Sequence, residues 1–178
     1  MTAVTEYKIE QAAADLVAMF IEVAPKLRGQ LFDVWRTYIQ NVGPVVLDCE
    51  PYDVELGIGG MRQKTQEAGA LFVSGLHCET AVFGERGNHW FRHVHDLGHL
   101  IYDLGFDAAS ENRVHTRLWR YWLQETDTYK ALGKARKENA MSLYYCDTVG
   151  QTDYFEQHGE FPADQFQFAV ERLRGVLE

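Results

Sequence analysis

Apolar residues recur at helical spacing along most of the chain, beginning near its start. They form one face of a helix over residues 6–24, and residues 26–41 repeat the pattern. Pro25 stands between the two stretches, where a proline is expected to end the first helix or open the second. The apolar positions of the first stretch are Ala12, Leu16, Met19, Phe20 and Val23.

The pattern weakens between residues 45 and 75. Residues 45–49, Val-Val-Leu-Asp-Cys, are short, apolar and β-branched, which predicts a strand or a buried extended segment. Residues 51–60 contain three glycines and a proline and are expected to form a loop. Residues 61–73 predict a short helix that ends at Ser74-Gly75.

Helical spacing returns after a predicted turn at residues 84–87. A helix is expected over residues 88–104, with Gly105 at its end. Asp107 or Ser110 is a candidate cap for the next helix, which should reach about residue 126. The apolar stripe of the first of these helices consists of Trp90, Val94, Leu97, Ile101 and Leu104.

The last third of the chain reads as two more helices. One is expected over residues 130–157, with a kink near Gly150, and Pro162 opens the other. The sequence therefore predicts an all-α protein, a single irregular bundle of five to seven helices with little or no sheet. Its 178 residues suit one domain, residues 1–178.

Composition excludes some functions and favours a compartment. The net charge of −9 argues against binding to a nucleic-acid backbone, which needs clustered lysine and arginine. No apolar run approaches the ~20 residues that span a membrane. Three cysteines without paired spacing, and no signal peptide, predict a cytoplasmic protein.

Residues 89–99 are the most unusual segment, because they hold four of the seven histidines. On a helix, His95 and His99 lie one turn apart on one face, where their imidazoles can converge on one metal ion. Arg92 and Asp96 share this polar side. The alternative is a solvated polar stripe opposite the buried one.

Two further pairs could complete such a site. Glu111 and His115 are again one turn apart, on a helix that folds back after Gly105 towards the histidines. Asp147 stands in an apolar, aromatic run, where an acid is paired, metal-bound or on the outer face, and Gln151 follows one turn later. The predicted site therefore lies within residues 77–151.

The segment His95-Asp96-Leu97-Gly98-His99 resembles the central box of the HD-type metal-dependent phosphohydrolases. That family is all-α, binds metal through a histidine, an adjacent His-Asp pair and a later aspartate, and contains many enzymes that cleave nucleotides. The resemblance implies that His95, Asp96 and Asp147 are ligands, with His77 as the candidate for the first histidine.

The same box is similar to that of bacterial aromatic amino-acid hydroxylases, in which two histidines and one acid hold a non-haem iron. This resemblance implies a triad of His95, His99 and Asp147. Over residues 77–168 the chain also resembles small bacteriophage-encoded proteins of unknown activity, which implies the host cytoplasm as its location. The shared elements are Phe91-Arg92, the histidine box, an acid near Glu111 and Gly150-Gln151.

We therefore expect a metal-dependent hydrolase that acts on a small-molecule phosphate ester or nucleotide through a metal-activated water. The metal would be a divalent ion, Mn, Zn, Mg, Co or Fe. The alternatives are a mononuclear non-haem iron oxygenase and a non-enzymatic helical protein with a structural metal or a protein partner; a homo-oligomer is compatible with each. The predicted metal ligands are His95, His99, Asp147 and His115, the catalytic groups Asp96, Glu111 and Arg92, and the substrate contacts Gln151 and Arg92.

Overall fold

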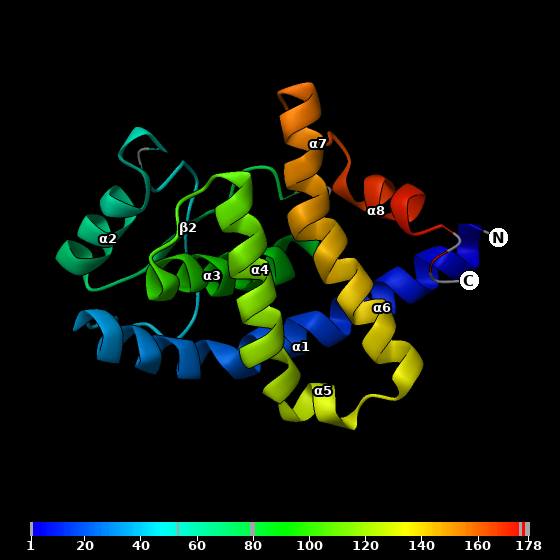
Figure 1. Ribbon diagram of the computed structural model, residues 1–178, viewed down its shortest axis with the longest axis horizontal. Coiled ribbons are helices and arrows are strands. Elements are labelled where there is room, and N and C mark those ends of the chain that lie inside the picture. Colours follow the sequence, from blue (N-terminus) through cyan, green and yellow to red (C-terminus); the bar gives the residue numbers. More distant parts are fainter. Residues whose placement is uncertain (1, 53, 79–80, 175, 177–178) are drawn as a thin grey trace.

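The computed structural model of the chain describes residues 2–52, 54–78, 81–174 and 176, and most of them are helical (Figure 1). The predicted all-α class is confirmed. The α-helices are α1 (Thr2–Trp35), α2 (Gly57–Ala68), α3 (Gly84–Tyr102), α4 (Ala108–Tyr121), α5 (Asp127–Ala131), α6 (Lys134–Tyr145), α7 (Gln151–His158) and α8 (Gln165–Leu173). Short 3-10 turns cover Val54–Leu56 and Leu123–Glu125.

Helix α1 continues through Pro25, so the predicted break at this proline is wrong. Pro25 is exposed, whereas Val23, Ala24 and Leu27 around it are fully buried. The carbonyl that loses its hydrogen bond to the missing N–H therefore lies on the solvent side, where water can satisfy it. Burial of the opposite face holds the 34 residues in one helix.

A small parallel sheet joins β1 (Val45–Leu47) to β2 (Phe72–Ser74), with Val46 opposite Val73. The extended segment predicted at residues 45–49 is thus confirmed in part. The helix predicted over residues 61–73 is wrong at both ends, because α2 begins at Gly57 and ends at Ala68. Gly69 takes a left-handed conformation (φ 62°) that ends the helix and lets the chain enter β2.

The histidine-rich helix α3 is found almost where it was expected. It starts at Gly84, so the turn predicted at residues 84–87 is its first turn, and it ends before Asp103 rather than at Gly105. Asp103 adopts a left-handed conformation with φ of 53°. Asp107 caps α4 as predicted, its carboxylate accepting a hydrogen bond from the backbone N–H of Ser110 at 3.1 Å.

The helix predicted over residues 130–157 is interrupted. The short α5 precedes α6, and between α6 and α7 the residues Cys146–Gly150 form a π-helical segment. In Figure 1 α6, this segment and α7 follow one another as one continuous helical rod. A π-helical turn holds one extra residue in the helical ladder, and such turns are frequent at functional sites.

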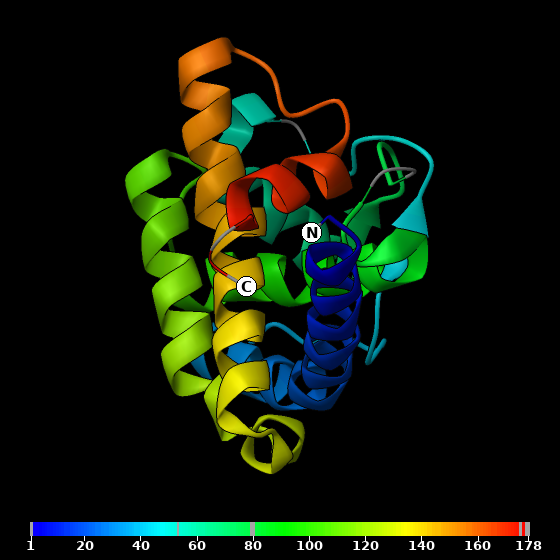
Figure 2. The same cartoon turned by 90° about the vertical axis from the view of Figure 1, so that its right-hand side faces the viewer.

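Helices α1 and α3 pack against each other, and α4 and the α6–α7 rod cross them side by side (Figures 1 and 2). Most of the described buried apolar residues form one core at this crossing. Its largest fully buried side chains include Tyr144, Phe20, Leu16, Met19, Leu27, Leu97, Leu100 and Leu118. None of the helices in the described ranges is both long and apolar enough to cross a bilayer.

Gly98 sets how closely α3 and α4 approach each other. A Cβ atom at this position would lie 2.9 Å from Leu118 and 3.0 Å from Val114, both buried on α4. The absence of a side chain therefore lets α4 lie directly against α3. Gly98 stands between His95 and His99 in sequence, so this contact brings α4 to the histidine pair.

Candidate metal centre

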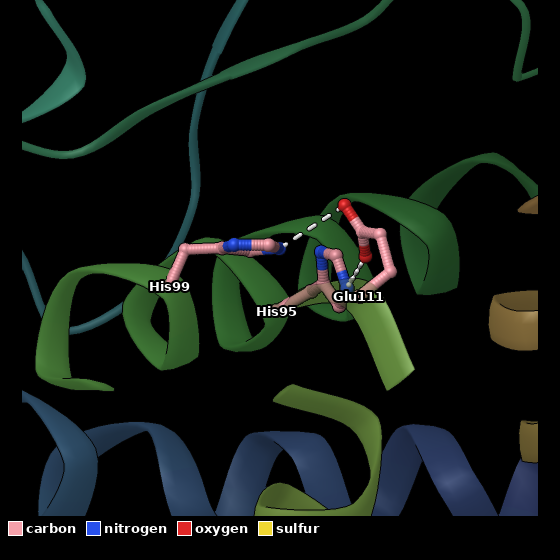
Figure 3. Close-up of side chains that lie close together, drawn as sticks. All are labelled: His95, His99 and Glu111. Atoms are coloured by element: carbon pink, nitrogen blue, oxygen red, sulfur yellow. Dashed lines mark ion pairs between the residues drawn. The ribbon is translucent and has the colours of Figure 1, made fainter. Parts of the chain in front are cut away.

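Three polar side chains from two helices converge at the α3–α4 contact. His95 and His99 lie one turn apart on α3, and Glu111 lies in the first turn of α4 (Figure 3). Nε2 of His95 is 2.9 Å from Oε2 of Glu111, and Nε2 of His99 is 3.3 Å from Oε1 of the same carboxylate. One donor atom from each of the three residues lies within 4.8 Å of the other two, a spacing that one metal ion could bridge.

The ring of His99 is held in place by the end of its own helix. Its Nδ1 lies 2.9 Å from the backbone carbonyl oxygen of Leu104. A carbonyl oxygen only accepts, so Nδ1 of His99 carries a proton, and Nε2 is the ring nitrogen that is left to bind a proton or a metal ion. The left-handed conformation of Asp103 turns the chain so that Leu104 returns to the ring. Metal-binding histidines are commonly oriented by this kind of hydrogen bond.

Nε2 of His99 is buried and makes no hydrogen bond with the described residues, although a carboxylate oxygen of Glu111 faces it. Two acceptors that face each other in a buried position repel unless a proton or a cation lies between them. The His99 side chain is 0% exposed, whereas those of His95 and Glu111 are 16% and 15% exposed. The cluster thus has a closed inner side and a side open to solvent.

Charge is concentrated between His95 and Glu111. Burial disfavours the imidazolium of His95, but the carboxylate of Glu111 and the neighbouring Asp96 outweigh burial and raise the pKa of His95 to about 10. Burial would raise the pKa of Glu111, but His95 and His99 outweigh it and hold that pKa well below its usual range. Without metal, His95 and Glu111 therefore form an ion pair, and a bound metal would replace the proton on His95.

Aromatic rings limit the space around the two imidazoles. The Phe91 ring lies 5.6 Å from His95, and the Phe106 ring lies 4.9 Å from His99, measured between centroids. Phe106 is 38% exposed, so it borders the cluster at the protein surface. Apolar walls lower the local dielectric and strengthen charge interactions in the cluster.

Of the two predicted catalytic groups on α3, Asp96 lies beside the cluster and Arg92 is bound to the sheet. Oδ1 of Asp96 is 3.9 Å from Nδ1 of His95, on the side of the ring away from Glu111. Arg92 donates a hydrogen bond of 2.6 Å to the carbonyl oxygen of Ser74, at the end of β2. This hydrogen bond anchors α3 to the sheet, so Arg92 has a structural partner that its sequence position did not suggest.

Asp147 lies outside the group of three, so its predicted place among the metal ligands stays a prediction. Its Oδ1 accepts a hydrogen bond of 2.7 Å from the side chain of Gln151, and both residues are buried. Burial raises the pKa of Asp147 to about 7, although His95, Arg92 and Gln151 oppose the rise. Gln151 is therefore a partner of Asp147, and its predicted contact with substrate stays a prediction.

His115 also lies outside the group of three, as the partner of Thr148 in the π-helical segment. The Thr148 hydroxyl donates to the carbonyl oxygen of Tyr144 at 2.7 Å, and it accepts from Nδ1 of His115 at 2.7 Å. Burial, together with the positive charge of His95, lowers the pKa of His115 to about 4. His115 is therefore a neutral buried histidine, and the carboxylate of the triad is Glu111 from the same helix.

Sequence reasoning missed two groups that orient the site. The backbone carbonyl of Leu104 holds His99, and no side-chain pattern reports on such a group. Thr148 holds His115, and its only signal is its position beside Asp147. His77, the candidate first histidine of the HD-type resemblance, is exposed and does not join the cluster.

Comparisons of the chain with protein-family models, with curated proteins and with solved structures found no match. The resemblances suggested by the histidine box therefore stay predictions. What the site can do is argued from its donor set, two imidazoles and one carboxylate. This set is the one found in zinc hydrolases with a His₂Glu site and in two-histidine, one-carboxylate iron enzymes.

Proposed function

We propose that the chain is a metal-dependent hydrolase whose divalent ion is bound by His95, His99 and Glu111. The observation that carries the proposal is the buried Nε2 of His99, which faces a carboxylate oxygen at 3.3 Å without a hydrogen bond. A cation between this nitrogen and this oxygen would form a metal–ligand bond with each of them. The second imidazole, His95, faces the other oxygen of the same carboxylate.

The number of ligands favours a catalytic ion. Structural zinc sites have four protein ligands, whereas catalytic sites have three and keep a position for water or substrate. A divalent ion lowers the pKa of a bound water towards ~7 and so supplies a nucleophile for hydrolysis. The partial exposure of His95 and Glu111 leaves this side of the site accessible to solvent.

Two acids could carry protons for such a reaction. Asp96 lies next to His95, and Asp147 is a buried carboxyl with a pKa of about 7, near the value that suits proton transfer at neutral pH. A phosphate ester or nucleotide stays the predicted substrate. Arg92 would contribute to binding it only through the part of its guanidinium that does not donate to Ser74.

The test is the metal content and affinity of purified protein. Wild-type protein, His99→Ala and Glu111→Gln are compared by elemental analysis and by titration with Zn²⁺ and Mn²⁺. We expect about one ion per wild-type chain and a loss of at least tenfold in affinity in each variant, because each removes one of three ligands. His158→Ala is the matched control, since this exposed histidine on α7 lies outside the cluster.

Activity is then measured without oxygen on p-nitrophenyl phosphate, bis-p-nitrophenyl phosphate and a set of nucleotides. Metal-dependent turnover that is lost in His99→Ala and kept in His158→Ala supports the hydrolase. Equal metal affinity in wild type, His99→Ala and Glu111→Gln would overturn the metal site. Tight metal binding without turnover, combined with unfolding on chelation, would assign a structural metal instead.

The donor set itself favours one second candidate, a mononuclear iron oxygenase. Two histidines and one carboxylate on one side of Fe(II) leave positions for dioxygen and substrate. This function predicts that Fe(II) restores activity, and that the protein consumes oxygen in the presence of a reductant. Turnover that proceeds without oxygen, with Zn²⁺ or Mn²⁺ as the only metal, would exclude it.

A further inference from the structure

A groove separate from the candidate metal centre lies between the first turns of α3 and the segment that leads into β1. It encloses about 540 Å³, a volume within the range of small-molecule sites. None of His95, His99 and Glu111 lines it. The lining residues are Gln40, Asn41, Val42, Gly43, Pro44, Val45, Val46, Arg86, His89 and Trp90.

The groove has apolar walls, and on one side its lining segment packs closely against Trp90. Val42 and Val46 are 50% and 38% exposed, so they offer apolar surface to a ligand in the groove. A Cβ atom on Gly43 would lie 2.6 Å from the indole of Trp90. Glycine thus lets this segment lie directly on Trp90, and the contact shapes the groove without filling it.

The charge of the groove is opposite to that of the whole protein. The chain has a net charge of −9, yet the described residues that line the groove include no Asp or Glu. They do include Arg86, which forms no ion pair with the described residues, and His89. Nε2 of His89 is buried without a hydrogen-bond partner among the described residues, a state that costs about 1–3 kcal/mol.

We propose that this groove binds a small organic anion, a phosphate or carboxylate with an apolar body. The apolar body would lie against Trp90 and Val42, and the anionic group would meet Arg86 and His89. The guanidinium of an arginine binds either anion through paired hydrogen bonds. Because the groove and the metal centre share no residue, this site does not depend on the proposed hydrolysis.

The probes are 1-naphthyl phosphate and 1-naphthoate, with neutral 1-naphthol as the reference. Binding is measured by isothermal titration calorimetry in EDTA, which prevents metal-dependent turnover. Arg86→Gln removes the charge at an exposed position, and Arg120→Gln is the matched control on the exposed side of α4. The double variant His95→Ala, His99→Ala reports whether a probe binds at the metal centre instead.

We expect at least one anionic probe to bind wild-type protein with a Kd below 1 mM and about fivefold or more tighter than 1-naphthol. Arg86→Gln should weaken that binding at least fivefold, and the control and the double variant should keep it. A preference between phosphate and carboxylate identifies the natural anion. The proposal is overturned by equal binding of 1-naphthol, by unchanged binding in Arg86→Gln, by loss of binding in the double variant, or by no binding of any probe.

Discussion

Glu111 shows how one side chain can define a candidate centre. It faces two histidines at once, and it is the member of the group that comes from a different helix. In sequence, Asp147 seemed the better carboxylate because it stands in an apolar run, and an acid there needs a partner. In the structure its hydrogen-bond partner is Gln151, a neutral amide, and Asp147 lies outside the group formed by His95, His99 and Glu111.

The buried carboxyl of Asp147 gives a pH-dependent prediction for the metal-free protein. Its pKa is about 7 in the folded state, against 3.8 for an ordinary aspartate, so the unfolded chain loses this proton first as the pH rises. Asp147 therefore lowers the free energy of unfolding progressively between about pH 4 and pH 7. Asp147→Asn should stabilise the protein at pH 8 by at least about 1 and up to about 4 kcal/mol, with little effect at pH 4.

Urea unfolding in EDTA at pH 4, 6 and 8 measures this difference. Asn keeps an oxygen that can accept from Gln151, so the substitution removes the charge and keeps the hydrogen bond. Asp33→Asn, at an exposed position on α1, is the control and should show no such trend. A variant that is equally destabilised at every pH would show that Asp147 is ionised in the folded protein.

At the scale of elements, the sequence predicted those helices that bury one apolar face and expose a polar one. Helix α3 was found because Trp90, Val94 and Leu97 alternate with polar residues at helical spacing. The helix break predicted at Pro25 was wrong, because a proline on the solvent side of a helix can be tolerated when water satisfies the freed carbonyl, and the sequence does not say which side is solvated. The π-helical segment at Cys146–Gly150 has no pattern of its own, so the direction of Asp147 could not be predicted.

The candidate site was therefore half predictable. His95 and His99 follow from one-turn spacing on one helix, which is a local property. Glu111 reaches the histidines only because α4 folds back against α3. The turn predicted after α3 indicated this correctly. Arg92 was predicted to be a catalytic and substrate-binding group, and its hydrogen bond to the backbone of Ser74 could not be foreseen, because contacts with distant backbone atoms leave no trace in the sequence.

The close contact of α3 and α4 predicts opposite effects for two glycine substitutions. Gly98→Ala adds a methyl group 2.9 Å from Leu118 in the core, so overpacking of about 1–3 kcal/mol should exceed the gain of about 1 kcal/mol in helix propensity. It should also separate Glu111 from the histidines and weaken Zn²⁺ binding. Gly29→Ala, with no atom within 4 Å of its Cβ, should stabilise the protein by up to about 1 kcal/mol.

Thermal unfolding of both variants, together with Zn²⁺ titration, tests this contact. Gly29 lies on α1, outside the site, so its variant should bind Zn²⁺ as the wild type does. If both variants changed stability in the same direction, the spacing of α3 and α4 would not depend on Gly98.

For the whole molecule, the metal centre should couple binding to stability. An ion bound by α3 and α4 stabilises only the folded chain, because the unfolded chain does not hold the three ligands together. At a free Zn²⁺ concentration of 100 times Kd, the stabilisation is about 2.7 kcal/mol, which corresponds to a rise in Tm of about 5–10 °C for a chain of this size. Differential scanning calorimetry with Zn²⁺ and with EDTA measures the change.

Removal of a ligand should reduce this stabilisation without abolishing the fold, to about 1.4 kcal/mol or less for a tenfold or greater loss of affinity. His99→Ala should show at most about half of the rise in Tm with Zn²⁺, whereas His158→Ala should keep the full difference. An equal rise in wild type and His99→Ala would mean that Zn²⁺ acts elsewhere on the protein, and the candidate centre would lose its support.

The extra residue in the π-helical segment makes the chain sensitive to its own length at this point. Deletion of one residue between Cys146 and Gly150 would restore an ordinary helix and rotate everything after it by about 100°. Gln151 would then turn away from Asp147, and α8 would meet α1 with a different face. Substitutions in this segment change one side chain at a time, but a single-residue deletion would change the relation between the two halves of the rod, and with it the surroundings of the candidate centre.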